Sequence, residues 1–338
     1  MDMCKRNINL TRSENNFLGY ELKADGFLNS KTYFGCQSDW PDMLRYCRKL
    51  NVMVTLENDI AIVVSKNGII LDNRNLSKQL LKVVTAENVE NAGKMSIQGT
   101  FLSMTNLNEK CSHSIFFNWK VNDELLKFVA KARLNILPTH YTTFIWNREN
   151  DPYCPFGCQK LESMAHVLNG CTAVFGNFYS RRHNRVVEKV ASFLRVCCPC
   201  LRIASDKCAE TLFPQLRNKL LEIPHRKPDI YVIDEVLKTC SILEVTVCYD
   251  KYLENAYEAK INRYESLVEC LNRNGYATKL FVLCFGSLGC VKKDIWNHLT
   301  KFSDDKCKIK GILKWISISN IIGSNYIWRH RVKKLCVT

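Results

Sequence analysis

The stretch KPDIYVIDEVLKTCSILEVTV, residues Lys227–Val247, contains two short apolar runs, DIYVID and CSILEVTV, on either side of a turn. Apolar runs of this length, bounded by polar turn residues, are typical of buried strands. The sequence therefore predicts a hairpin. A turn centred between Val236 and Leu237 places Asp229 directly opposite Glu244, and directly opposed side chains on one face lie roughly 5 Å apart.

The two opposed carboxylates are candidate metal ligands. They repel each other and need a cation, and Mg²⁺ is commonly held by one or two carboxylates together with a phosphate. Thr246 lies on the same face as Glu244, because strand side chains alternate. In the alternative interpretation, Asp229 merely begins a strand and Glu244 pairs with a surface lysine. The apolar run SILEVTV argues against this, since a charge there is costly unless paired.

A lysine on the following segment completes this candidate site. Lys251–Asn274 has helical periodicity and ends at an Asn-Gly pair. One side of that helix carries Ala256, Lys260, Tyr264 and Leu267. If the helix packs against the hairpin, Lys260 points toward the acids, where it can orient a water or stabilise charge on a phosphate. In the alternative interpretation, Lys260 is solvated.

Further along the chain, the pattern indicates an α/β fold. ATKLFVLCFG, residues 277–286, predicts a buried strand, and Asp294–Phe302 predicts a helix. The order strand, strand, helix, strand, helix indicates a mixed sheet with flanking helices.

A cysteine and histidine cluster precedes this region. YCPFGCQKLESMAHVLNGC, residues 153–171, contains Cys154, Cys158, His166 and Cys171 in the order C-x3-C-x7-H-x4-C. Closed Cys3His sets are typical structural zinc sites, so the sequence predicts a bound Zn²⁺ with no position left for water. In the alternative interpretation, these are buried reduced cysteines and a core histidine.

A second cysteine group follows in VCCPCLRIASDKC, comprising Cys197, Cys198, Cys200 and Cys208. It lacks a histidine, and partly buried thiols are the favoured interpretation. The chain has 18 cysteines and no secretory signal at its beginning, so clustered Cys and His favour metal binding over disulfides.

Basic residues point to a polyanionic partner. The chain carries 48 Lys and Arg against 33 Asp and Glu, a net charge of +15, which favours nucleic acid. FYSRRHNRVVEKVASFL predicts a helix whose cationic residues suit phosphate contacts, although a solvated helix face is the commoner case. The predicted nucleic-acid-binding residues are Arg181, Arg182, His183 and Arg185 on this helix, which also carries Lys189, together with Arg226 and Lys227 before the hairpin.

The first hundred residues give fewer signals. Val52–Leu56 and Asp59–Ser65 predict two strands of a hairpin, and KNGIIL adds a second turn at Asn67-Gly68. No run of about 18 apolar residues occurs, which argues against a membrane span.

Several of these segments together resemble the C-terminal region of non-LTR retrotransposon polyproteins that carry a restriction-like endonuclease. The similar parts are LNILPTHYTTF, the zinc cluster with ESMAHVLNGC, SRRHN, RKPDI with LEVTV, and AYEAKINRY. The resemblance implies a PD-(D/E)xK nuclease fold that nicks target DNA with Mg²⁺, so that the freed 3′ end primes reverse transcription. It implies that Asp229 and Glu244 are the metal-binding acids and Lys260 a lysine moved onto the helix. Thr246 stands where the family pattern usually has lysine.

The resemblance also implies a division of the chain into four regions. Residues 1–119 resemble a region that follows the polymerase, with NFLGYEL similar to a strand behind the catalytic hairpin; FSDD at Phe302–Asp305 is interpreted as a solvated turn, not as a polymerase motif. Residues 120–196 form a helical linker with the zinc module and basic helix. Residues 197–310 form the endonuclease core and residues 311–338 a basic C-terminal helix.

The sequence thus predicts a retrotransposon-derived, Mg²⁺-dependent DNA endonuclease with structural zinc. The alternative is a nucleic-acid-binding remnant that does not cleave; a third possibility is an interaction protein with a basic surface. The expected partners are double-stranded DNA and the element RNA, and the expected location is the nucleus, with weak support from RHRVKK near the end.

Overall fold

The computed structural model describes residues 76–148 and 151–336, together with five short strands between residues 32 and 71. The chain divides into two compact units, Met1–Lys94 and Met95–Thr338. In the first unit, β3 (Val52–Glu57) and β4 (Ile60–Ser65) form an antiparallel hairpin, and β5 (Ile70–Leu71) extends it. The two predicted strands are confirmed, whereas Asn67-Gly68 and NFLGYEL lie outside the described residues. β1 (Thr32–Tyr33) pairs with β2 (Cys36–Gln37), and α4 spans Leu76–Gly93.

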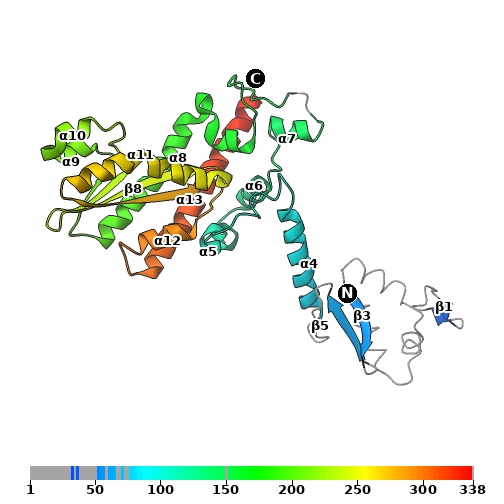
Figure 1. Cartoon of the computed structure of the whole chain (residues 1–338). Coiled ribbons are helices and arrows are strands. Elements are labelled where there is room, and N and C mark those ends of the chain that lie inside the picture. The colour runs from blue at the N-terminus through cyan, green and yellow to red at the C-terminus, as the bar shows by residue number, and fades with distance from the viewer. Residues whose placement is uncertain are drawn as a thin grey trace. The chain divides into compact units, whose positions relative to one another are not determined.

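The second unit is built around a four-stranded mixed sheet (Figure 1). Its strands lie in the order β6 (Arg202–Ser205), β7 (Ile230–Asp234), β8 (Thr239–Cys248) and β9 (Ala277–Gly286). The first two pairings are antiparallel and the last is parallel. The β7–β8 hairpin has the predicted register, because Ile230 opposes Leu243 and Asp234 opposes Thr239. The mixed sheet with flanking helices is therefore confirmed, and the short strand β6 was not predicted.

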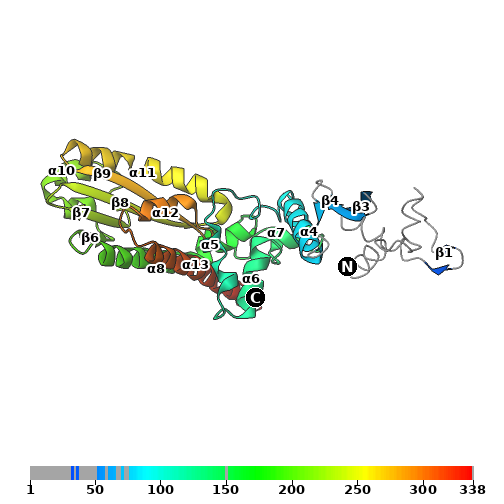
Figure 2. The same cartoon turned by 90° about the horizontal axis from the view of Figure 1, so that it is seen from below.

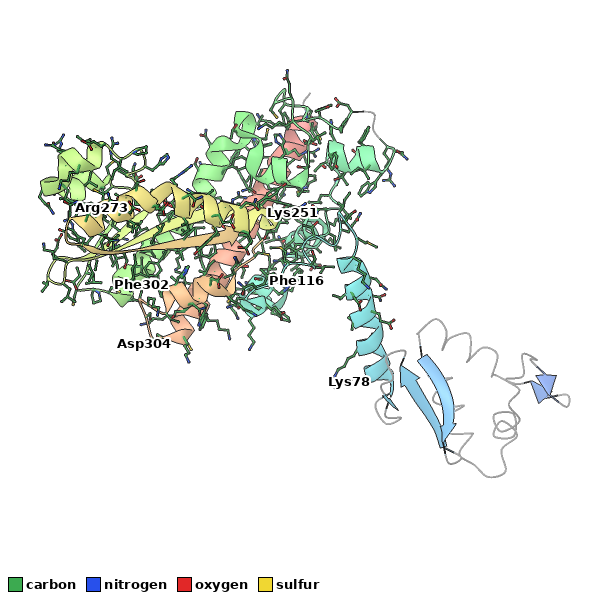
Figure 3. All side chains as sticks on the ribbon, viewed as in Figure 1. Lys78, Phe116, Lys251, Arg273, Phe302 and Asp304 are labelled. Carbon is green, nitrogen blue, oxygen red and sulfur yellow. The ribbon has the colours of Figure 1, made fainter. Side chains whose placement is uncertain are left out.

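Helices cover both faces of this sheet (Figure 2). The helix α11 (Leu253–Arg273) connects the parallel strands β8 and β9, and Figure 3 labels Lys251 just before it and Arg273 at its end. It packs through Tyr264, Leu267 and Leu271 against alternate residues of β7 and β8, together with the short helices α9 (Ala209–Leu212) and α10 (Arg217–Leu221). The opposite face packs against α8 (Thr172–Cys197), α12 (Lys293–Leu299) and α13 (Lys306–Leu335). The strand period of two thus divides the sheet residues between two cores.

The last helix is longer and more deeply buried than its sequence suggests. Asp305 caps α13 by accepting hydrogen bonds from the backbone N–H groups of Cys307 and Lys308. The predicted solvated turn at FSDD agrees with the exposure of Asp304 (Figure 3), although Phe302 packs on Phe281. Polar residues of α13 enter the core because Ser317, Asn320 and Ser324 donate hydrogen bonds to carbonyls of the turn after β9.

Shorter helices precede the sheet. They are α5 (Glu109–Ser112), η2 (Ser114–Phe117), α6 (Asp123–Arg133) and α7 (His140–Ile145), with later single turns η3 (His166–Gly170), η4 (Pro214–Leu216) and η5 (Asp250–Tyr252). Asn122 caps α6 by accepting a hydrogen bond from the backbone N–H of Leu125. The boundaries predicted at 119/120, 196/197 and 310/311 all fall inside the second unit, because α8 and α13 pack against the sheet and against each other.

Within the part of the chain that the structure describes, no helix has the length and apolar character needed to cross a membrane.

A buried ion pair ties α13 to the segment that holds the cysteines. The Arg331 guanidinium donates from Nε to Glu162 Oε1 at 2.8 Å and from a second nitrogen to Oε2, and both residues are buried. Glu162 also accepts a hydrogen bond from the backbone N–H of His140 at 2.8 Å. Removal of the cation leaves an uncompensated carboxylate in the core.

We therefore expect Arg331→Met to lower the free energy of unfolding by about 3–5 kcal/mol. Denaturant unfolding measures this change. Arg329→Met is the matched control, because Arg329 lies two positions earlier on α13 and its pair with Glu124 is exposed and 3.9 Å long. The control should cost less than about 1 kcal/mol. Equal losses from the two variants would show that the buried pair has no special role.

Candidate functional site

The acid pair lies where β7 begins. Asp229 immediately precedes β7 and, by continuation of the register, stands opposite Glu244 on β8. Their contacts are reciprocal. The backbone N–H of Asp229 donates to Glu244 Oε2 at 3.2 Å, and the N–H of Val245 donates to Asp229 Oδ2 at 2.8 Å. Hairpin register and side-chain alternation, both local properties of the sequence, thus bring the two carboxylates together.

Lys260 reaches this pair from α11. Its Nζ donates a hydrogen bond to Glu244 Oε1, and Glu244 itself is only 3% exposed. Burial raises the pKa of Glu244, and the nearby charge of Asp229 raises it further, while Lys260 acts in the opposite direction. The lysine thus offsets part of the cost of keeping two carboxylates ionised side by side.

His183 also belongs to this site, although the sequence analysis assigned it to nucleic-acid contact on the basic helix. Its Nε2 lies 3.4 Å from Asp229 Oδ2 and 3.1 Å from the carbonyl oxygen of Val245. Burial alone lowers the pKa of His183, but the hydrogen bond and charge of Asp229 outweigh it and raise the pKa to about 9. His183 therefore restrains the Asp229 carboxylate instead of facing outward from α8. Only the docking of α8 on β8 reveals this, and no sequence pattern near His183 signals it.

The pair has an open side. The contacts recorded among the described residues engage Asp229 through Oδ2 and its main chain, and not through Oδ1. A cavity of about 530 Å³ opens beside Asp229 between α8 and β6, and Ser205, Asp206 and Arg195 also line it. Oxygen ligands with room for further oxygens suit Mg²⁺, which keeps several waters or phosphate oxygens in its shell. The residues present therefore fit a magnesium ion.

Thr246 places a neutral hydroxyl on β8 at the position where a lysine would place a positive charge. Its Oγ1 is buried and has no hydrogen-bond partner among the described residues. β8 therefore supplies no cation beside Glu244, and the nearby ammonium group comes from Lys260 on α11.

The four predicted zinc ligands converge. One ligand atom from each of Cys154, Cys158, His166 and Cys171 lies within 4.8 Å of every other. Cys158 Sγ is 3.1 Å from His166 Nε2 and 3.8 Å from Cys171 Sγ. Tyr153 bridges Leu161 in a small antiparallel loop, and Gly157, at φ +78°, allows the tight turn between the first two cysteines.

Burial changes the protonation of these residues, and a bound cation would change that of the thiols in the opposite direction. Burial raises the pKa of the Cys154 and Cys171 thiols and lowers the pKa of His166. Neutral imidazole is the form that binds a metal, and a dication stabilises the thiolates that burial alone disfavours. The Cys3His cluster can therefore hold a zinc ion.

The second cysteine group does not form such a cluster. Among the described residues, the set at Cys154–Cys171 is the one group of three or more Cys, His and acidic side chains close enough to share a metal. Cys198 Sγ instead lies 3.5 Å from the carbonyl oxygen of Phe302, and Cys200 is exposed.

The six predicted nucleic-acid-binding residues occupy different environments. Arg181 and Arg185 are exposed on α8. Arg182 is buried and donates to Ser324 Oγ at 2.7 Å and to the Leu168 carbonyl at 3.0 Å, so it holds α8 to its neighbours, and its contact with DNA stays a prediction. His183 contacts the acid pair, as described above. Two further residues are ion-paired: Arg226 with Glu210 at 3.0 Å and Lys227 with Asp206 at 2.6 Å.

Comparison with known proteins gives one informative similarity. No protein-family profile matches the chain. Over 137 residues the chain is 28% identical to the Retrovirus-related Pol polyprotein from type-1 retrotransposable element R2 of Popillia japonica. The match covers 40% of this chain and 25% of that polyprotein. The chain is therefore distantly similar to a retrotransposon polyprotein, which supports a retroelement-derived function, and the matched part spans about a quarter of its relative's length.

Proposed function

We propose that this chain is a retroelement-derived DNA endonuclease of the PD-(D/E)xK type that uses Mg²⁺ to nick double-stranded DNA. One observation carries the proposal. Asp229, Glu244 and Lys260 meet at one point, although they come from the start of β7, from β8 and from α11. The mixed sheet around them and the similarity to a retrotransposon polyprotein support the same proposal.

The chemistry is the hydrolysis of a phosphodiester. A water oxygen attacks phosphorus, one P–O bond breaks, and the departing strand end takes up a proton. Asp229 Oδ1 and Glu244 would hold the Mg²⁺, which supplies charge stabilisation at the phosphate oxygens. Lys260 Nζ, fixed on Glu244, can orient the water or stabilise developing negative charge. His183 holds Asp229 through Oδ2, and the contacts among the described residues leave Oδ1 available.

Zinc has a structural part in this proposal. The cluster lies directly before α8, the helix that carries His183 to the acid pair. A Zn²⁺ ion there would fix the start of that helix. The proposed partners are double-stranded DNA and the element RNA, and the proposed location is the nucleus.

The alternative function is nucleic-acid binding without cleavage. Thr246 favours it, because β8 offers a buried hydroxyl where a lysine would otherwise stand. The two functions differ in whether Lys260 substitutes for that lysine.

The variant Lys260→Gln tests whether Lys260 takes the role of the lysine that is missing at position 246. We expect it to slow nicking of supercoiled plasmid in Mg²⁺ by about 10²- to 10³-fold, as loss of one electrostatic group at a reacting phosphate does. Lys279→Gln, at an exposed lysine on β9, is the control and should nick at the wild-type rate. If Lys260→Gln nicks plasmid at the wild-type rate, Lys260 has no part in catalysis. A folded wild-type protein that binds DNA but does not nick it would establish the alternative.

A further inference from the structure

A groove runs between α8 and α13. Its volume is about 260 Å³, and its walls are formed by Phe178, Arg181, Arg182, Arg185, Ser319, Ile322, Gly323 and Tyr326. We call it the α8–α13 groove. The α8 residues recur three or four positions apart, as do those of α13, so each helix presents one continuous face to it.

The α8–α13 groove is separate from the acid pair. Successive helical residues are turned by roughly 100°, so His183 lies about 200° around α8 from both Arg181 and Arg185. Because His183 faces Asp229, the two arginines face the opposite way. A ligand in the groove would therefore not be the phosphodiester at the acid pair.

Aromatic rings form one end of the groove. Phe178 packs edge-on against Tyr326 with ring centroids 5.4 Å apart, and its centroid is 4.9 Å from that of His330. Despite these contacts, Tyr326 is 55% exposed and the neighbouring Ile322 is 44% exposed. Gly323 also lines the groove and lets the Arg182 side chain pack closely on α13, since a Cβ there would approach that side chain to 3.0 Å. The groove thus offers a planar, partly apolar surface to solvent.

Positive charge surrounds this surface. Arg181 and Arg185 are exposed, and neither forms an ion pair with any residue in the described part of the chain. Arg182 forms part of the wall, and its buried Nε has no hydrogen-bond partner among the described residues. A ligand with both a negative charge and a flat apolar face would complement these features. Nucleotides have both, and in a single strand their faces are accessible.

We propose that the α8–α13 groove binds single-stranded nucleic acid, with a base stacked on Tyr326 and the flanking phosphates paired with Arg181 and Arg185. Duplex DNA does not suit it, because bases in a duplex are stacked on each other and cannot cover Tyr326. Stacking on aromatic side chains beside a cationic track is a general mode of single-strand binding. The proposal rests on nucleic acid as the partner in the proposed function, but it does not depend on cleavage.

The test is fluorescence anisotropy in Mg²⁺-free buffer, with labelled oligothymidine, the same backbone with abasic positions, oligouridine, and a duplex. We expect oligothymidine to bind more tightly than the abasic strand. Tyr326→Ala should weaken oligothymidine binding about tenfold without weakening abasic binding, and Tyr326→Phe should restore it. Tyr252→Ala, at an exposed tyrosine outside the groove, is the control. Arg185→Gln should weaken binding of both strands and reduce the salt dependence by about one phosphate contact.

Several outcomes would overturn the proposal: equal binding of normal and abasic strands, equal effects of Tyr326→Ala and Tyr252→Ala, an equal loss of duplex and oligothymidine binding in Tyr326→Ala, or displacement of oligothymidine by polyglutamate with a similar affinity. The affinities for oligouridine and oligothymidine are compared to show whether the groove prefers single-stranded RNA or single-stranded DNA. Plasmid nicking is measured separately. Nicking without strand binding contradicts this proposal alone, and strand binding without nicking contradicts the nuclease alone.

Discussion

Asp229→Asn and Glu244→Gln should each reduce plasmid nicking by on the order of 10³-fold or more, because each removes a charged oxygen ligand from the proposed Mg²⁺ site. Both changes keep the side-chain volume nearly constant. They also remove repulsion between two adjacent carboxylates, one of which is buried and has a raised pKa. Each change also takes away the partner of a cationic side chain, Lys260 or His183, so thermal unfolding of each variant must show that it is folded before a loss of activity is assigned to the metal site.

Glu235→Gln is the control for both variants. Glu235 lies on the same hairpin, but at the exposed turn beyond the far end of β7. Initial nicking rates in Mg²⁺ are compared with thermal unfolding of the same preparations. Full activity in either acid-pair variant would show that the carboxylates do not hold the catalytic metal, even though they lie side by side.

The second large effect concerns zinc. We expect the double substitution of Cys154 and Cys158 by serine to abolish zinc binding and to destabilise the second unit by several kcal/mol, because structural zinc contributes its binding energy to folding. Cys154 and Cys171 are buried in the same hydrophobic cluster as Phe175 of α8, so loss of the metal should loosen the start of that helix. Metal analysis of purified protein and thermal unfolding measure the two effects.

Cys200→Ser provides the matched control, since Cys200 is an exposed cysteine of the second group. Its zinc content should equal that of the wild type, at one ion per chain. Retention of zinc by the double variant, or its loss in Cys200→Ser, would contradict the assignment of the ligands.

The hairpin and its acid pair were predictable because their determinants are local. Strand length, side-chain alternation and the turn at Val236–Leu237 together fix which residue opposes Glu244, and the observed register agrees. The position of Lys260 followed from helical periodicity once α11 was assumed to pack on the hairpin, and its contact with Glu244 agrees with that assumption. The cysteine cluster was predictable for the same reason, since its four ligands lie within one short segment.

The residues whose positions were not predictable depend on packing between distant segments. Arg182 and His183 are neighbours on a helix whose sequence predicts a basic, exposed face. Arg182 nevertheless contacts Ser324 of α13, and His183 contacts Asp229 beside β7. The burial of Ser317 and Asn320 was also not predictable. Their hydrogen-bond partners are carbonyl groups at the end of β9 and in the turn after it, 28 and 34 residues away in the sequence. A polar residue in an apolar helix reads as exposed until its partner is known.

The most direct test of the central claim is nicking of supercoiled plasmid by the folded, zinc-loaded wild-type protein in Mg²⁺, with a matched reaction that lacks the divalent cation. If Asp229, Glu244 and Lys260 form the nuclease site, the plasmid is converted to open circles in a reaction that requires Mg²⁺ and is abolished by Asp229→Asn. Intact plasmid after incubation with a protein that still shifts DNA in a gel would contradict it, and would make Asp229, Glu244 and Lys260 a structural cluster in a nucleic-acid-binding protein.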